Sequence, residues 1–216
     1  MSLVVVAGGH GKIGRRLLAM LVEHGHQARG LIRNPDHAQD LELIGAEPAL
    51  CDLEHASAED VAEQVRGADA VVFAAGAGPG SGPERKRTMD YGGAVTLIAA
   101  CLATGVDRYL IVSTMGADDP GSGGEQMRPY FEAKGAADRA LVESGLAYTI
   151  CRPGALTDDP GTGMVEIAEH LGRRGMIPRD DVAATLFDCL ERENTIRKTF
   201  ELLTGPTPID QALAAF

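Results

Sequence analysis

The sequence predicts an α/β fold in which helices cover both faces of a doubly wound parallel sheet. Short apolar runs rich in β-branched residues alternate along the chain with longer amphipathic stretches, as strands joined by crossover helices do. Glycine-rich segments follow several of the apolar runs directly, and loops at the carboxyl ends of strands form the ligand crevice of such sheets. The length of 216 residues suits one domain, so we expect a single domain over residues 1–216.

About seven strands are predicted, each a short apolar run. They are Leu3–Ala7, Gln27–Ile32, Pro48–Cys51, Ala70–Ala75, Tyr109–Ser113, Tyr148–Cys151 and Thr199–Leu203. Helices are predicted where Leu, Ala and Val recur at three- and four-residue spacing. These stretches are Gly11–Glu23, Ala58–Val65, Tyr91–Ala103, Met127–Glu143 and Arg179–Arg192. Gly25, Gly105 and Gly145 suit left-handed caps at three of the helix ends.

Three irregular segments follow predicted strands. Gly76–Pro83 and Asp118–Gly124 are crowded with Gly, Pro and Ser and are predicted to be loops beside the ligand crevice. The stretch from Thr157 to Gly163, continuing to Gly175, lies beyond the sixth predicted strand. We expect a small substrate-covering region there, at about 155–178.

Charge and hydropathy exclude several classes of partner. The formal net charge of −11 repels nucleic acid backbones and anionic lipid surfaces, so neither is expected as a partner. No apolar run approaches the eighteen or so residues of a membrane span. The chain enters its first predicted strand without a basic segment or cleavage signal, so we expect a cytoplasmic protein. No sequence feature supports an oligomer.

The cysteines are predicted to be buried, reduced thiols. Each of the four lies among apolar residues, with no C-x-x-C pair and no histidine at ligand spacing. They are Cys51, Cys101, Cys151 and Cys189. We therefore expect no metal site.

A glycine-rich turn links the first predicted strand to the first helix, with the sequence Gly8-Gly9-His10-Gly11-Lys12-Ile13-Gly14. Without side chains, Gly8, Gly11 and Gly14 let the backbone approach a pyrophosphate and let helix and strand pack closely. The helix N-terminus adds amide groups and a partial positive charge. The turn follows five apolar residues and precedes an amphipathic helix, and this position predicts the dinucleotide site of a Rossmann fold. The predicted residues of the site in this turn are Gly8, His10, Gly11, Lys12, Ile13 and Gly14.

The end of the second strand favours NADP(H) over NAD(H). The strand ends in Leu31-Ile32-Arg33-Asn34-Pro35, with no acid before Asp36 to accept a hydrogen bond from the adenosine ribose. Arg33 can instead pair with a 2′-phosphate, and Asn34 is its neighbour in the site. A solvated surface role for Arg33 is the alternative.

Two further segments are candidate walls of the cofactor site. Asp52 and Leu53 follow the third strand, where they would lie near the adenine ring, although Asp52 could equally cap the next helix. The small residues Ala74, Ala75 and Gly76 would leave room for the adenosine and its ribose. Plain packing explains them equally well.

A tyrosine and a lysine one helical turn apart form the candidate catalytic pair. Tyr130 and Lys134 share a helix face, so the lysine charge would favour the phenolate and the pair could move a proton to a carbonyl. Ser113 and Thr114 at the end of the fifth strand could supply a hydroxyl to the substrate oxygen. Capping of the local backbone is the alternative role of these hydroxyls.

With these motifs, the chain resembles the short-chain dehydrogenase/reductase superfamily. The likeness is to its small atypical branch of bacterial NAD(P)H-binding proteins, often described as epimerase- or dehydratase-like. It covers nearly the whole chain. The motifs that carry it are Gly8–Gly14, Gly25-His26, Arg33-Asn34-Pro35, Asp52-Leu53, Asp90-Tyr91-Gly92-Gly93, Ser113-Thr114, Tyr130 with Lys134, Ser144–Gly154 and Ile177–Ala183.

The resemblance implies roles for individual residues. Tyr130 matches the proton donor, and Lys134 would hold the nicotinamide ribose. Thr114 takes the position of the catalytic hydroxyl, where serine is more usual, with Ser113 beside it. Pro153 and Gly154 would line the nicotinamide pocket. The chain lacks the substrate domain of nucleotide-sugar epimerases, so we expect no sugar nucleotide as substrate.

Three functions are compatible with these residues. The first is an NADPH-dependent oxidoreductase that transfers hydride to a small carbonyl-like substrate. The second is a non-catalytic NADP(H)-binding sensor that reports redox state to a partner. The third is an NAD(P)-dependent epimerase or dehydratase that holds its cofactor tightly.

Overall fold

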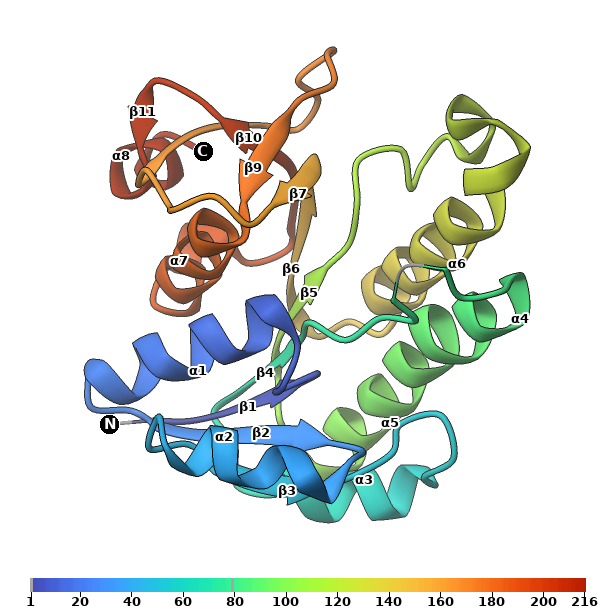
Figure 1. Ribbon diagram of the computed structural model, residues 1–216, viewed down its shortest axis with the longest axis vertical. Helices are drawn as coiled ribbons and strands as arrows, with labels where there is room; N and C mark the ends of the chain where they lie inside the picture. Colours follow the sequence, from blue (N-terminus) through green and yellow to red (C-terminus); the bar gives the residue numbers. More distant parts are fainter. Residues whose placement is uncertain (1, 79) are drawn as a thin grey trace.

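A nine-stranded sheet forms the centre of the molecule, with helices on both faces (Figure 1). The computed structural model describes residues 2–78 and 80–216, so residue 79 of the predicted loop Gly76–Pro83 lies outside the described part. The strands of the sheet are β1 (Leu3–Ala7), β2 (Gln27–Ile32), β3 (Glu47–Leu50), β4 (Ala70–Phe73), β5 (Arg108–Val112), β6 (Ala147–Pro153), β8 (Met164–Ala168), β10 (Lys198–Thr204) and β11 (Thr207–Pro208). Their order is β11-β8-β10-β6-β5-β4-β1-β2-β3.

The strands from β3 to β10 in this order are parallel, as the sequence predicts. The chain moves outward from β1 to β2 and β3, then returns to place β4 on the other side of β1. The ends of β1 and β4 therefore border the crevice that forms where the winding direction reverses. The predicted doubly wound α/β fold is confirmed.

The central strand β1 is buried because both of its faces are covered. Its side chains alternate between two cores, so Val4 and Val6 pack on one side and Val5 and Ala7 on the other. The first core is covered by α1 (Lys12–Glu23), α2 (Ala38–Glu42), α7 (Arg179–Leu190) and α8 (Ile209–Ala214). The second is covered by α3 (Ala58–Val65), α5 (Ala94–Thr104) and α6 (Gly124–Glu143). Figure 1 shows the two helical layers on opposite sides of the sheet.

The segment beyond β6 differs from its prediction. The stretch from Thr157 to Gly175 was expected to be irregular, yet β8 lies within it and pairs antiparallel with β10. The flanking strands β7 (Ala155–Thr157) and β9 (Met176–Pro178) form a separate two-stranded parallel sheet. Glycines and prolines around these strands suggest a loop, whereas hydrogen bonds from distant segments make them extended. The prediction of an irregular stretch is therefore wrong, whereas the substrate-covering region at about 155–178 stays a prediction.

The helix before β5 begins earlier than expected and in a different form. The chain passes from α4 (Pro83–Arg85) through the π-helical turn η2 (Lys86–Gly93) into α5, so the predicted Tyr91–Ala103 helix starts inside that wider turn. The predicted glycine caps are present: Gly25, Gly105 and Gly145 have φ values of +80°, +75° and +79°.

All four cysteines are buried and unpaired, as predicted. Across residues 2–78 and 80–216, every helix is too short or too polar to cross a membrane.

Candidate functional site

A cavity of about 1170 Å³ lies at the carboxyl ends of the parallel strands. The glycine turn after β1 forms one part of its wall, and residues from η2 and α6 form another. The predicted site residues on this wall are Gly8, His10, Gly11, Lys12, Ile13, Arg33, Asp52, Leu53, Ala74, Ala75, Gly76, Ser113, Tyr130 and Lys134. The fold thus brings most of the predicted cofactor residues and the predicted catalytic pair to one cavity.

The glycine turn has a geometry that side chains would prevent. Gly8 has φ +80°, and a Cβ added there would lie 2.7 Å from the Cα of Ala75 in the loop after β4. Gly14 packs so closely on Gly8 that an added Cβ would overlap the Gly8 carbonyl oxygen. Helix α1 then begins after Gly11 with no side-chain cap and no acid in its first turn. This uncapped helix N-terminus fits the pyrophosphate of a dinucleotide.

Arg33 follows β2 and lines the cavity. Its side chain is 56% exposed, and its Nη1 lies 3.5 Å from a carboxylate oxygen of Glu54. Glu54 is largely buried and also contacts Arg85 at 3.0 Å and the Thr88 hydroxyl at 2.8 Å. Since Arg85 and Thr88 already bind Glu54, this carboxylate leaves much of the Arg33 charge available to an anion.

Asn34 and Asp52 organise the local backbone. The Asn34 side chain accepts a hydrogen bond from the amide of Asp36 and caps a 3₁₀ turn. Asp52 accepts from the amide of Glu54 and lines the cavity, so it closes a turn before α3. The cap of α3 is Ser57. The alternative in which Asp52 caps that helix is therefore wrong.

His10 is held in the glycine turn by contacts with the segment after β2. Its ring stacks on that of His37, with centroids 3.6 Å apart, and its Nε2 lies 2.7 Å from Asp40. The hydrogen bond with His10 and the nearby Arg15 charge lower the pKa of Asp40. His10 and His37 both line the cavity.

Lys12 connects the glycine turn to the segment after β7. It pairs with Asp158, whose other carboxylate oxygen accepts a hydrogen bond from Arg179 at 2.8 Å. The two cations lower the pKa of Asp158. Lys12 and Arg179 line the cavity. From the described part of the predicted substrate-covering region, 155–178, Leu156 also lines it.

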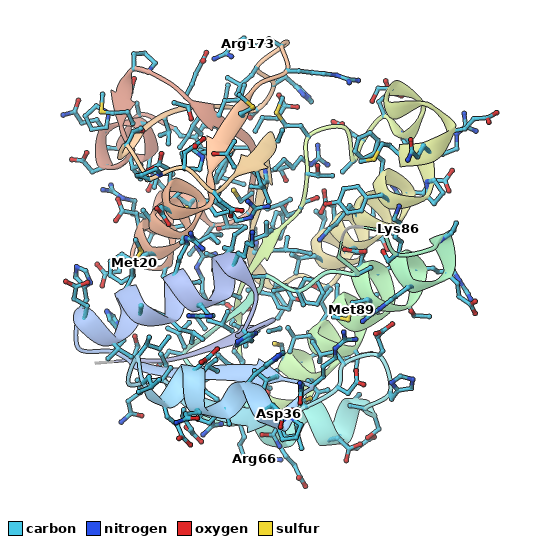
Figure 2. All side chains as sticks on the ribbon, viewed as in Figure 1. Met20, Asp36, Arg66, Lys86, Met89 and Arg173 are labelled. Atoms are coloured by element: carbon cyan, nitrogen blue, oxygen red, sulfur yellow. The ribbon has the colours of Figure 1, made fainter. Side chains whose placement is uncertain are left out.

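Tyr130 and Lys134 line the cavity but have different partners. The Lys134 side chain is almost completely buried, donates to the Val112 carbonyl at 2.9 Å and lies 3.4 Å from Oδ1 of Asp90. Tyr130 is half-buried, and the ammonium of Lys86 lies 6.0 Å from its ring centroid. Figure 2 labels Lys86, which belongs to the segment η2 that packs against α6.

Of the two hydroxyls at the end of β5, Ser113 is the one on the cavity wall. Its Oγ donates to Asp138 at 2.9 Å, and Nε of Arg152 donates to the same carboxylate oxygen at 3.0 Å. Burial raises the pKa of Asp138 despite these two partners. The Thr114 hydroxyl donates to the carbonyl of Met115 at 3.3 Å.

The remaining predicted residues lie outside the cavity wall as described. They are Gly14, Asn34, Thr114, Pro153 and Gly154. Gly14 supports the turn through its contact with Gly8, and an added Cβ on Gly154 would collide with Leu203. Their parts in cofactor binding stay predictions.

Sequence reasoning missed several wall residues, including Lys86, Met89 and Asp90 of η2. Asp90 belongs to one of the motifs that carry the family resemblance, but sequence reasoning assigned it no role in the site. Wide helical turns have no simple hydrophobic period, so neither their exact course nor the face they present could be read from spacing. Among the described residues, no group of three His, Cys, Asp or Glu side chains is placed to hold a metal ion.

Known proteins share this fold and much of this sequence. The model of the NAD(P)H-binding family matches residues 8–193. An uncharacterized sugar epimerase of Bacillus subtilis (strain 168), YhfK, is 40% identical over 211 residues, which cover 97% of this chain and 98% of that protein.

Two solved structures agree in fold over nearly their whole length. A Bacillus halodurans protein, described as a candidate NAD-dependent epimerase/dehydratase, is 36% identical with a TM-score of 0.95 and 100% coverage of both chains. The oxidoreductase ylbE of Lactococcus lactis is 28% identical with a TM-score of 0.87, covering 99% of this chain and 96% of its own. The chain therefore belongs to the NAD(P)H-binding family, among Rossmann-fold proteins of the atypical short-chain dehydrogenase/reductase type.

Proposed function

We propose that this protein is an NADPH-dependent reductase of a small carbonyl compound, with Tyr130 as the proton donor. One observation carries the proposal: a single cavity is lined by the glycine turn, by Arg33 and by the Tyr130–Lys134 pair. Backbone amides at the start of α1 would hold the pyrophosphate, Arg33 the 2′-phosphate and Lys134 the nicotinamide ribose. A reduced nicotinamide supplies the hydride when it is bound.

The residues of the chain account for the proton. The Tyr130 hydroxyl would donate its proton to the carbonyl oxygen as negative charge develops there. Ser113 has its own proton engaged with Asp138, so its oxygen is left to accept a hydrogen bond from a ligand. Ser113 would therefore orient a donor group.

The test of the chemistry is Tyr130→Phe. We expect the loss of NADPH absorbance with an accepted carbonyl substrate to slow at least about 100-fold, the lower range of general acid catalysis, with NADPH affinity nearly unchanged. Undiminished turnover would remove Tyr130 from the mechanism. If the wild type consumed no NADPH across a broad carbonyl panel yet bound NADPH and NADP⁺ very differently, the sensor would replace the reductase.

The test of cofactor choice is Arg33→Ser. We expect NADPH binding to weaken by about tenfold or more and NADH binding to change little, because a charge-assisted contact to the 2′-phosphate is lost. Arg87→Ser is the matched control, since Arg87 is exposed and absent from the cavity wall. An equal loss for both cofactors would contradict the preference for NADP(H).

Epimerase or dehydratase chemistry is the second candidate, favoured by the descriptions of the Bacillus subtilis and Bacillus halodurans relatives. Such an enzyme returns the hydride to its substrate and consumes no cofactor. Product formation from a sugar substrate with no net change in NADPH absorbance would favour it over the reductase.

A further inference from the structure

Lys86 lies on the cavity wall, and within residues 2–78 and 80–216 no carboxylate oxygen lies within 4.0 Å of its ammonium. Six cationic side chains line the cavity: Lys12, Arg33, Arg85, Lys86, Lys134 and Arg179. The other five lie within 4.0 Å of a carboxylate oxygen of Asp158, Glu54 or Asp90. Lys86 is also half-buried, so part of its hydration is lost without an ion pair in exchange.

The π-helical turn η2 places Lys86 on the wall of the cavity. Lys86, Met89 and Asp90 of this turn line the cavity, while the exposed Arg87 between them does not. The closest aromatic partner of the ammonium is the Tyr130 ring, at 6.0 Å from Nζ to the centroid. This contact compensates only weakly for a missing anion, since the distance is at the outer limit for cation–π attraction.

The position of Lys86 points to the substrate as the source of the missing anion. The phosphates of the cofactor have their own expected partners at the start of α1 and at Arg33. Lys86 lies instead beside Tyr130, where the proposed chemistry takes place. The carboxylate of Glu125 also lines the cavity, but it is exposed to solvent, which screens its charge.

We propose that Lys86 binds an anionic group, a carboxylate or a phosphate, of the carbonyl substrate. Met89, Met127 and Leu156 on the same wall provide apolar surface for the rest of the molecule. The substrate class is thus a small carbonyl compound with an apolar body and an anionic substituent. This inference rests on the proposed reduction at Tyr130 and names the kind of compound reduced.

The experiment compares matched aldehydes bound to the NADPH-loaded protein. The probes are benzaldehyde, para-carboxybenzaldehyde and para-formylphenyl phosphate. Binding is followed through the fluorescence of bound NADPH in the Tyr130→Phe background, where reduction is too slow to consume the NADPH, and turnover is measured separately in protein that keeps Tyr130. We expect Tyr130→Phe protein with Lys86 intact to bind at least one anionic aldehyde about tenfold more tightly than benzaldehyde, the gain from a hydrogen bond to a charged group. The stronger of the two anionic probes identifies the carboxylate or the phosphate.

Lys86→Met should abolish this preference and leave benzaldehyde binding unchanged, because it keeps an unbranched apolar stem and removes the charge. Lys86→Arg should restore most of the preference, and Arg87→Met should leave it unchanged. Circular dichroism and NADPH affinity check that each variant is folded. If the Lys86→Met protein is not folded, Lys86→Gln takes its place.

The outcomes separate this inference from the proposed function. Equal binding of all three aldehydes, no binding of either anionic probe, or a preference retained in folded Lys86→Met or Lys86→Gln protein overturns the role of Lys86. Turnover of neutral aldehydes would still support the reductase in that case. A Lys86-dependent preference without any NADPH oxidation would instead support the anion site and count against the reductase.

Discussion

The ammonium of Lys134 lies 3.4 Å from Oδ1 of Asp90, and both side chains are almost completely buried. Lys134 comes from α6 and Asp90 from η2, so the ion pair joins two helical segments that pack against each other. Asp90 also accepts a hydrogen bond from the amide of Ala77 in the loop after β4. The pair therefore links α6, which carries Tyr130, to the loop beside the predicted cofactor site.

Removing Asp90 should destabilise the fold strongly, because it leaves a buried ammonium without its counterion. We expect Asp90→Ala to lower the free energy of unfolding by about 3–5 kcal/mol, measured by urea denaturation. The double variant Asp90→Leu/Lys134→Met should lose less than Asp90→Ala alone, since no isolated charge stays buried. If the losses in Asp90→Leu and in Lys134→Met added up to the loss in the double variant, the two side chains would have no coupling energy.

A methyl group on Gly14 should disrupt the glycine turn. In Gly14→Ala the new Cβ would overlap the Gly8 carbonyl oxygen, so the turn must open. We expect a loss of about 1–3 kcal/mol in unfolding free energy, as for other overpacked sites, and weaker NADPH binding by titration.

Gly92→Ala is the matched control for this substitution. Its added Cβ would lie at an ordinary distance of 3.5 Å from the Arg87 carbonyl oxygen, inside a helical segment. We expect unchanged or slightly higher stability there. Equal losses in the two variants would mean that a general effect of alanine, and not the close approach of Gly14 to Gly8, is responsible.

The central strands could be predicted from the sequence because their signal is local. The bounds of β1 and β2 match the predicted ranges. Strand β1 is apolar along its whole length because both of its faces are covered, and β2 ends in the buried run Gly30-Leu31-Ile32. Strand β8 could not be predicted in this way. Its extended form depends on pairing with β10, and the preceding turn is held by hydrogen bonds from the amides of Thr162 and Gly163 to Asp181.

The candidate site was predictable where a motif carries its own geometry. The glycine turn and the Tyr130–Lys134 spacing both led to residues on the same cavity wall. The partners of those residues were not predictable, because they depend on contacts between distant segments. The approach of Glu54 to Arg33 and of Lys86 to Tyr130 belongs to this class.

The ion pairs of Asp158 should make stability depend on acidic pH. Its pKa is lowered from 3.8 in the folded protein, so its contribution is present above 3.8 and is lost as pH falls through the lowered value. As the pH is lowered from neutral toward acid unfolding, the unfolding free energy should fall less in Asp158→Asn than in the wild type. Asp159→Asn, at the exposed neighbouring position, should follow the wild type in the same urea titrations. Identical pH profiles for all three proteins would show that the Lys12 and Arg179 contacts do not stabilise the fold.

The four thiols should be nearly unreactive in the native protein, and Cys51 should react first. Burial raises the pKa of Cys51 to about 11 and that of Cys101 to about 12, so the thiolate that attacks a disulfide reagent is scarce near neutral pH. Cys51 lines the cavity, whereas Cys101 lies in the core between the sheet and its helices. We therefore expect slow labelling by Ellman's reagent, with a first phase that Cys51→Ser removes and Cys101→Ser retains.

NADPH should slow that first phase of labelling further if it occupies the cavity. Rapid labelling of all four thiols without denaturant would contradict their burial, and a first phase indifferent to NADPH would place the cofactor away from Cys51.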